Sequence, residues 1–179
     1  MENLHVASHW FQKAAAIQFE TSPFIGGEYR SAKGRDTFTT VNPATEAALA
    51  SFTDAEDITV DQAVAAARKA FRSWRLLSPD TRKGLLLAIA DRMATERNTL
   101  ALLDCLEMGM PITMALEQVD DAISYLRYNA ELIDKVYGEI APANPATTLA
   151  LSQPEPRGVI GVISPWNFPI LTAMLSIAP

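Results

Sequence analysis

Asn167 is the residue whose type and surroundings are best suited to chemistry. Its carboxamide offers two N–H donors and has no proton to lose, and Pro165 and Pro169 restrict the backbone on either side of it. A neutral donor held in a fixed place can stabilise negative charge that develops on a substrate oxygen. The same side chain could instead cap the helix that the apolar residues from Ile170 onward predict, because Asn is a favoured N-cap residue. From the residues alone, the cap is the simpler interpretation.

The other chemically capable side chains are predicted to be structural. The single cysteine, Cys105, stands among Leu103, Leu106 and other apolar residues of a predicted helix, whereas a reactive thiol needs a cationic or dipolar setting. His5 and His9 are four residues apart, but no carboxylate completes the H-E-x-x-H pattern of zinc enzymes. We therefore expect no metal site and no nucleophile in this chain.

The segment before Asn167 is predicted to be a buried strand. Residues 159–163 form an unbroken apolar run, which is typical of a strand covered on both faces of a parallel sheet. The order strand, rigid loop, helix would place Asn167 at the carboxyl end of that strand, where ligands bind in open α/β sheets. Gly158 and Gly161 form only G-x-x-G, which falls short of the dinucleotide-binding fingerprint.

Helical periodicity dominates the middle of the chain. Apolar residues recur at spacings of three and four, with start and stop signals such as Ser78-Pro79 and Gly109. The longest run could be a coiled coil or a single helix packed on a domain. The predicted helices cover residues 3–20, 59–74, 78–93, 98–109 and 116–137.

Short hairpins are predicted near the N-terminus. Gly26-Gly27 lies between two β-prone pairs of residues, which is a hairpin signal. A second pair of strands is expected around Asn42-Pro43-Ala44-Thr45, because Asn followed by Pro is a turn signature. The overall class is therefore α/β, helix-rich, with hairpins at the N-terminus and a parallel sheet that remains incomplete.

The composition is that of an ordinary globular protein. Apolar residues make up 49% and charged residues 20% of the 179 residues, which suits one domain with a core. The net charge is −6 and the basic residues are scattered, which argues against a nucleic-acid surface. One cysteine allows no intramolecular disulfide, which fits a reducing compartment, and we expect a cytoplasmic protein.

Residues 158–179 carry no charge and are long enough to suggest a membrane span. Pro165, Asn167 and Pro169 lie in the middle of this stretch, where a spanning helix needs unbroken backbone hydrogen bonds. We therefore predict no membrane span.

Several segments, in order, resemble NAD(P)-dependent aldehyde dehydrogenases. The most specific is EPRGVIGVISPWNFP at Glu155–Pro169, which resembles the segment that leads into the cofactor cleft of that family. The N-terminal HWFQKAAAIQFE also resembles members that oxidise γ-glutamyl-aminobutyraldehyde and related ω-amino aldehydes. The remaining matches are FIGGEY at 24–29, VNPATE at 41–46, AVAAARKAF at 63–71 and RYNAELIDKVYGE at 127–139.

The resemblance implies a role for each part of the last segment. In the family, a cysteine thiolate adds to the aldehyde, and the PWN asparagine, here Asn167, hydrogen-bonds the resulting oxyanion. Ile163, Ser164, Pro165 and Trp166 match the strand end that lines the NAD or NADP site, largely through backbone groups. Residues 143–156 match β-structure that helps to form the homo-oligomer.

The resemblance also implies what residues 1–179 lack. The family's cofactor-binding lysine, glycine-rich turn, glutamate base and nucleophilic cysteine belong to later segments. We therefore expect an incomplete N-terminal part of the Rossmann-like cofactor-binding domain, without the catalytic domain. The complete enzyme would oxidise a small aldehyde to a carboxylic acid with NAD or NADP. The chain alone is expected to be inactive and not to bind the cofactor by itself. The alternative is a non-catalytic remnant or interaction module.

Overall fold

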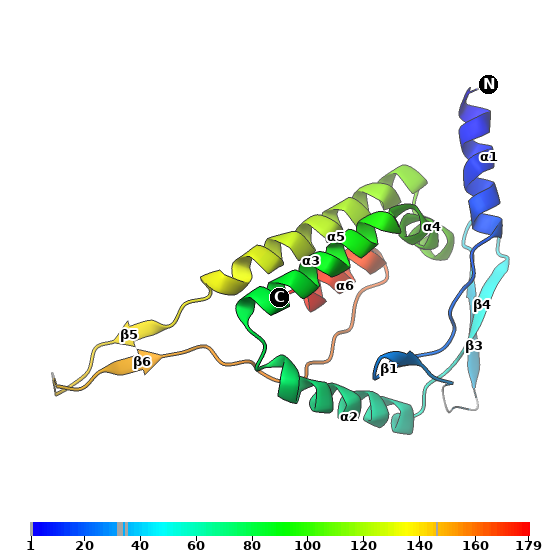
Figure 1. The fold of residues 1–179 in the computed structure, drawn as a ribbon. Coiled ribbons are helices and arrows are strands. Elements are labelled where there is room, and N and C mark those ends of the chain that lie inside the picture. Colours follow the sequence, from blue (N-terminus) through cyan, green and yellow to red (C-terminus); the bar gives the residue numbers. More distant parts are fainter. Residues whose placement is uncertain (1, 32–33, 35, 146) are drawn as a thin grey trace.

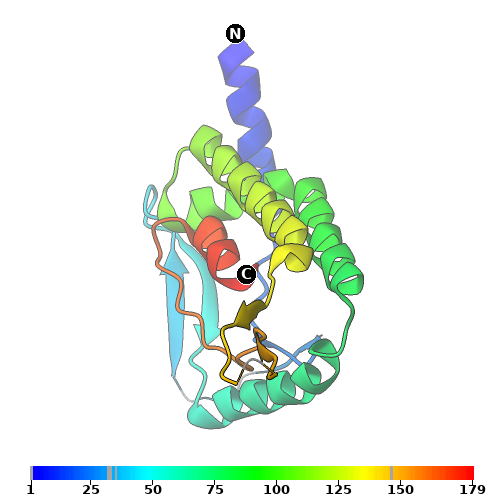
Figure 2. The ribbon, with the colours of Figure 1, turned by 90° about the vertical axis from the view of Figure 1, so that its left-hand side faces the viewer.

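The computed structural model describes residues 2–31, 34, 36–145 and 147–179, with side chains from Ser8 onward. Among these residues, the buried core is formed by helices, and the strand pairs extend away from it (Figures 1 and 2). The helices are α1 (Glu2–Ala15), α2 (Asp57–Trp74), α3 (Pro79–Thr95), α4 (Arg97–Met108), α5 (Ile112–Leu132), the 3-10 turn η1 (Ile133–Lys135) and α6 (Pro169–Ile177).

Local sequence signals set the bounds of the helices. At the start of α3, Ser78 accepts a hydrogen bond from the Thr81 N–H at 3.2 Å, and Pro79 occupies the first turn, where its missing N–H costs nothing. At the end of α4, Gly109 adopts a left-handed conformation with φ 77°, as helix C-terminal glycines commonly do. The predicted helices of the middle of the chain are therefore confirmed to within a few residues.

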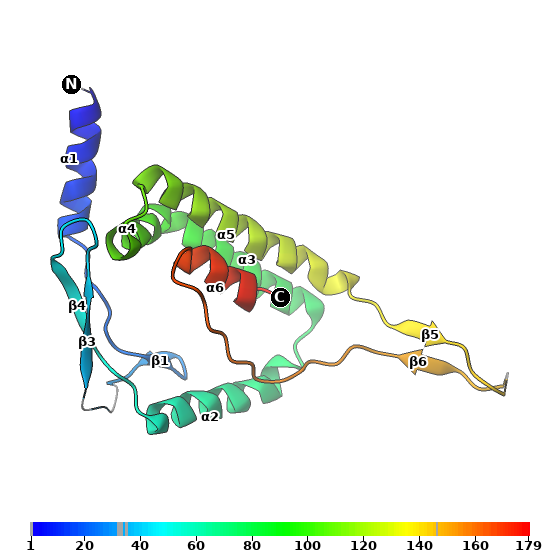
Figure 3. The same ribbon diagram turned by 180° about the vertical axis from the view of Figure 1, so that it is seen from behind.

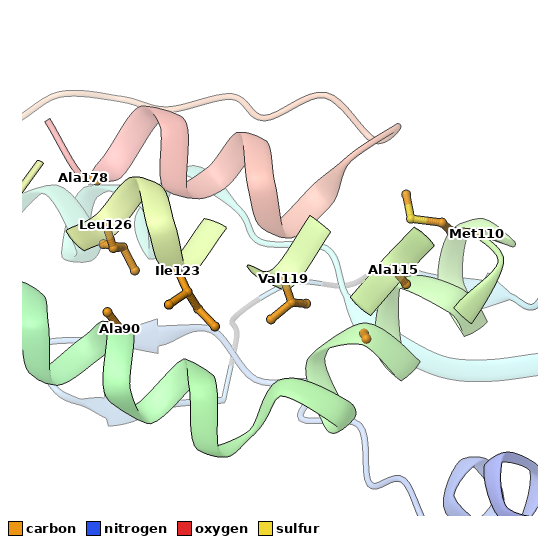
Figure 4. Close-up of a cluster of buried hydrophobic side chains, with 8 residues drawn as sticks. Ala90, Met110, Ala115, Val119, Ile123, Leu126 and Ala178 are labelled. Atoms are coloured by element: carbon orange, nitrogen blue, oxygen red, sulfur yellow. The ribbon is translucent and has the colours of Figure 1, made fainter. Parts of the chain in front are cut away.

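The core lies where α5 crosses α3, α4 and α6 (Figure 4). Val119, Ile123 and Leu126 of α5 point toward α3, and Leu126 and Val119 are the largest fully buried side chains. The long periodic run is thus a helix packed within one domain, as the family resemblance favoured. Small residues at several positions let the helices approach closely. The buried cluster consists of Ala90, Ala101, Met110, Ala115, Val119, Ile123, Leu126 and Ala178.

The strands form three separate antiparallel pairs. β1 (Phe24–Ile25) and β2 (Glu28–Tyr29) are joined by Gly26 and Gly27, whose φ values of 67° and 92° suit a tight hairpin turn. In the second pair, the Asn42 side chain accepts a hydrogen bond from the Ala44 N–H at 2.9 Å and closes the predicted turn. Both predicted hairpins are therefore confirmed. The other strands are β3 (Thr37–Val41), β4 (Ala48–Thr53), β5 (Glu139–Ala141) and β6 (Ala150–Ser152).

The predicted incomplete parallel sheet is wrong: among the described residues there is no parallel strand pair. Residues 159–163 run as an isolated extended segment toward α6 (Figure 3). Ile163 is 98% exposed, so the apolar run is not covered on both faces. A parallel strand needs neighbours supplied by crossover connections, and no described segment lies beside residues 159–163 as a neighbouring strand.

The chain also exposes much more surface than a self-contained domain of its size. Its accessible surface is 13,049 Å². A folded monomer of 19.5 kDa is expected to expose about 8,500 Å². The β5–β6 hairpin and α1 project from the packed helices, and the extended segment runs between α2 and α6 (Figure 1).

Candidate functional site

A tight turn at Trp166 and Asn167 connects the extended segment to α6. Pro169 occupies the first helical turn of α6, and Phe168 takes the N-cap position with φ −144°. The fixed φ of Pro169 and the direction change at Phe168 hold the turn at one end of the helix.

Asn167 does not cap α6, which removes the simpler of the two interpretations of this residue. The N-cap residue is Phe168, and no side chain of the cap accepts a hydrogen bond there. Asn167 is exposed, and within the described part of the chain its carboxamide makes no hydrogen bond. Both of its N–H donors are therefore available to a ligand.

α6 anchors the turn that carries Asn167. The Thr172 hydroxyl donates to the Phe168 carbonyl at 2.7 Å and lies 3.5 Å from the Pro165 carbonyl. Phe168, Ile170 and Met174 pack against the helical core. The turn is thus attached to the best-packed part of the molecule, although its own side chains face outward.

The backbone preceding the turn has free polar groups. Among the described residues, no backbone–backbone hydrogen bond involves residues 158–164. Ile163 and Trp166 are 98% and 81% exposed. This stretch can therefore offer backbone N–H and C=O groups to a bound molecule.

An open pocket of about 610 Å³ lies beside the turn. It joins Ser164, Pro165 and Trp166 to residues of β3, α4 and α6, and Ile163 and Asn167 are not among its lining residues. The other lining residues are Thr40, Val41, Pro43, Glu107, Met108 and Pro169. The sequence did not predict that β3 or the last turn of α4 lies at the site, because a local pattern cannot predict contacts with residues more than fifty positions away.

A buried acid, Asp104, lies on α4 next to the beginning of α6. It is 3% exposed, and one of its oxygens, Oδ2, is buried without a hydrogen-bond partner. Burial raises the pKa of Asp104 to about 6; the nearby Glu107 raises it further, whereas a hydrogen bond from the Ile170 N–H lowers it. Sequence reasoning missed this residue, because an acid in a helix is most simply a surface charge.

The remaining candidate groups have structural environments. Burial raises the pKa of the Cys105 thiol, which disfavours the thiolate that a nucleophile needs. Asp120 accepts hydrogen bonds from Arg97 at 2.6 Å, and these hold the pKa of Asp120 below its ordinary value. Arg127 pairs with Asp91 at 3.0 Å, so these charges connect α5 to α4 and α3.

No three His, Cys, Asp or Glu side chains gather as a metal site in the part of the chain that is described, which excludes the side chain of His5. None of the described helices has the length and apolar character of a membrane span.

Comparisons with known proteins agree on one family. The sequence model of the Aldehyde dehydrogenase family matches residues 29–179. The chain is 41% identical to the NADP/NAD-dependent aldehyde dehydrogenase PuuC of Escherichia coli (strain K12), over 99% of this chain and 36% of that protein. It is also 41% identical to aminoacetaldehyde dehydrogenase of Pseudomonas aeruginosa, over 93% of this chain and 34% of that protein.

Solved structures show the same likeness. The fold matches γ-glutamyl-γ-aminobutyraldehyde dehydrogenase from Burkholderia cenocepacia with a TM-score of 0.91 and 40% identity, over 96% of this chain and 35% of that one. It matches the Pseudomonas syringae indole-3-acetaldehyde dehydrogenase AldA, solved with NAD+, with a TM-score of 0.89 and 35% identity, over 94% and 34%. The chain thus spans about a third of the length of these relatives.

Proposed function

We propose, since this chain belongs to the aldehyde dehydrogenase family, that residues 1–179 form the N-terminal part of the cofactor-binding domain of an NAD(P)-dependent aldehyde dehydrogenase. The complete enzyme would oxidise a small aldehyde to a carboxylic acid. Relatives named for ω-amino aldehydes, such as aminoacetaldehyde and γ-glutamyl-γ-aminobutyraldehyde, favour an aldehyde of that class as the substrate. The catalytic domain would follow the segments described here.

Asn167 is assigned the oxyanion-donor role in this proposal. The single observation that carries it is the exposed carboxamide of Asn167, which makes no hydrogen bond within the described chain and is not used as a helix cap. A carboxamide can donate an N–H to the aldehyde oxygen as that oxygen gains negative charge, without itself changing protonation. The turn is fixed through α6, so the donor needs little reorganisation during the reaction.

Residues 163–166 are assigned to the cofactor. The backbone groups of Ile163 and Ser164 have no backbone partner in the described chain, and Pro165 and Trp166 continue the same exposed surface. These residues therefore fit a ligand that is held by main-chain groups beside an apolar wall. When bound, NAD(P)+ accepts the hydride that the aldehyde carbon loses.

The β5–β6 hairpin is proposed to join copies of the enzyme. It projects from the helices, and its apolar side chains Ile140, Leu149 and Leu151 are each about 70% exposed or more. An exposed two-stranded ribbon has free edges that readily pair with another chain. Residues 143–156, of which residue 146 lies outside the described residues, include β6 and would supply part of this contact.

The test is an active chimera. Residues 1–179 would be joined to the remaining two-thirds of the Burkholderia cenocepacia relative, whose N-terminal third they match. Loss of one oxyanion donor lowers kcat by a factor on the order of 10²–10³. We expect Asn167→Ala to lower kcat by a factor in that range and to leave the circular dichroism spectrum unchanged. Asn98→Ala, an exposed asparagine of α4, is the matched control and should keep full turnover. Near-normal kcat in Asn167→Ala would remove the catalytic assignment and favour a purely structural role for the turn.

A further inference from the structure

Asp104 stands out from the rest of the core because its carboxylate is buried without a compensating charge. It makes no ion pair within the described residues, and the one charged neighbour that affects it, Glu107, is also negative. Its Oδ2 atom has no hydrogen-bond partner there. Such an arrangement costs free energy, since a buried polar group without a partner loses its hydration and gains nothing in return.

The start of α6 lies close to this carboxylate. The first four N–H groups of a helix have no partner in the helix itself, and α6 has no side-chain cap of its own at Phe168. α4 and the first turn of α6 lie side by side (Figures 1 and 3). The N–H of Ile170, in that first turn, lies close enough to the Asp104 carboxylate to lower its pKa.

We propose that Asp104 is a positioning residue: its carboxylate, held on α4, caps the first turn of α6 from outside and thereby fixes the Trp166–Asn167 turn. The proposal rests on the oxyanion-donor role proposed for Asn167. Asp104 lies on a helix of the core and does not touch the reacting atoms. It acts by limiting the positions that the Asn167 carboxamide can take, because only two residues lie between Asn167 and Ile170. A negative charge also interacts favourably with the positive end of the α6 dipole.

If Asp104 had only a packing role, substitutions at this position would affect α6 differently. If Asp104 served only the packing of α4, an apolar side chain of similar size would replace it without consequence for α6, since it would remove the buried charge. If Asp104 holds the start of α6, the same replacement leaves the Ile170 N–H buried without an acceptor. The conservative replacement by Asn keeps an acceptor oxygen in the same place.

The first arm of the test measures amide hydrogen exchange by mass spectrometry on the 179-residue chain. Asp104→Leu should speed exchange in peptides covering residues 166–172 by about tenfold or more, the scale expected for one lost buried hydrogen bond. Peptides from α5 are the internal reference in each variant, because loss of the buried charge changes the global stability of all core regions alike. Relative to α5, exchange at residues 166–172 in Asp104→Asn should stay within about threefold of wild type. Asn98→Leu is the control, because it makes the same kind of polar-to-apolar replacement at an exposed position of α4, and it should leave residues 166–172 unchanged.

The second arm measures steady-state kinetics in the chimera described above. Asp104→Leu should lower kcat by about tenfold with little change in KM, and Asp104→Asn should restore most of it, because ground-state binding does not use the oxyanion donor. Unchanged exchange at residues 166–172 in Asp104→Leu overturns the proposal, as does faster exchange with unchanged kcat. An equal loss of protection in α5 and α6 also overturns it, because that is the pattern of a general packing defect. Asn167→Ala in the same chimera separates the two proposals: normal turnover in that variant refutes the catalytic role of Asn167, whatever Asp104 does.

Discussion

Because the carboxylate of Asp104 is buried, we expect the free energy of unfolding of the chain to depend on pH. Its pKa in the folded chain is about 6, against an ordinary value of 3.8 that applies to the unfolded chain. Between these values the folded chain binds more protons than the unfolded chain, so the free energy of unfolding falls as pH rises through this window. The ionised carboxylate therefore destabilises the fold fully above about pH 6 and ceases to do so below the unfolded pKa. Asp104→Asn removes the charge while keeping shape and acceptor, so it should stabilise the folded chain at neutral pH.

The magnitude follows from the size of the pKa difference. One pKa unit corresponds to about 1.4 kcal/mol, so a rise from 3.8 to about 6 corresponds to about 3 kcal/mol above pH 6. Near pH 4 Asp104 is largely protonated in the folded chain, so the free energies of unfolding of Asp104→Asn and wild type should differ by less than about 1 kcal/mol. Urea unfolding followed by far-UV circular dichroism measures it, at micromolar concentrations where light scattering shows one species. Equal m-values in the two proteins would show that only stability has changed.

Asp120→Asn provides a control of the opposite sign. Hydrogen bonds from Arg97 lower the pKa of Asp120, so this group stabilises the fold above its unfolded pKa and stops doing so as pH falls. Because the pair is largely exposed, its loss should cost less than about 1 kcal/mol at neutral pH. The reasoning about Asp104 is refuted if Asp104→Asn is less stable than wild type near neutral pH, or if the difference does not change with pH.

Three other outcomes are expected. Residues 1–179 alone should not oxidise aldehydes with NAD or NADP, because no cysteine among the described residues lines the pocket beside the Asn167 turn; turnover by pure chain far above background contradicts this. Leu126→Ala should cost about 2–5 kcal/mol in the same urea assay, since Leu126 is 1% exposed, whereas Leu76→Ala, at a 79% exposed position, should change stability by less than about 0.5 kcal/mol. The isolated chain should associate as its concentration rises above the micromolar range, because its accessible surface of 13,049 Å² far exceeds that of a compact domain; a monomeric mass by light scattering that does not change with concentration would refute it.

Local signals explain why the helices and hairpins could be predicted. Ser78, Pro79 and Gly109 act on backbone groups within a few residues of themselves, so their effect is the same in any fold. The positive φ of Gly26 and Gly27 likewise belongs to the turn alone. The family, too, could be identified from ordered motifs, of which EPRGVIGVISPWNFP was the most specific.

The parallel sheet shows where local pattern fails. Residues 159–163 have the composition of a buried strand, but a strand is defined by its hydrogen-bonded neighbours, and none of the described segments supplies one. The composition of a segment can show that it suits a buried strand position, but it does not supply the neighbouring strands that would bury it.

The sequence by itself determined the family, the helices, the hairpins and the turn that carries Asn167. Only the tertiary structure decided what that turn rests on: Phe168, not Asn167, occupies the N-cap of α6, and Asp104 of α4 meets the Ile170 N–H. The physical reason is one of range. Capping, turn formation and periodicity depend on residues a few positions apart, whereas burial and the pKa of Asp104 depend on which distant helices come together to exclude water from it.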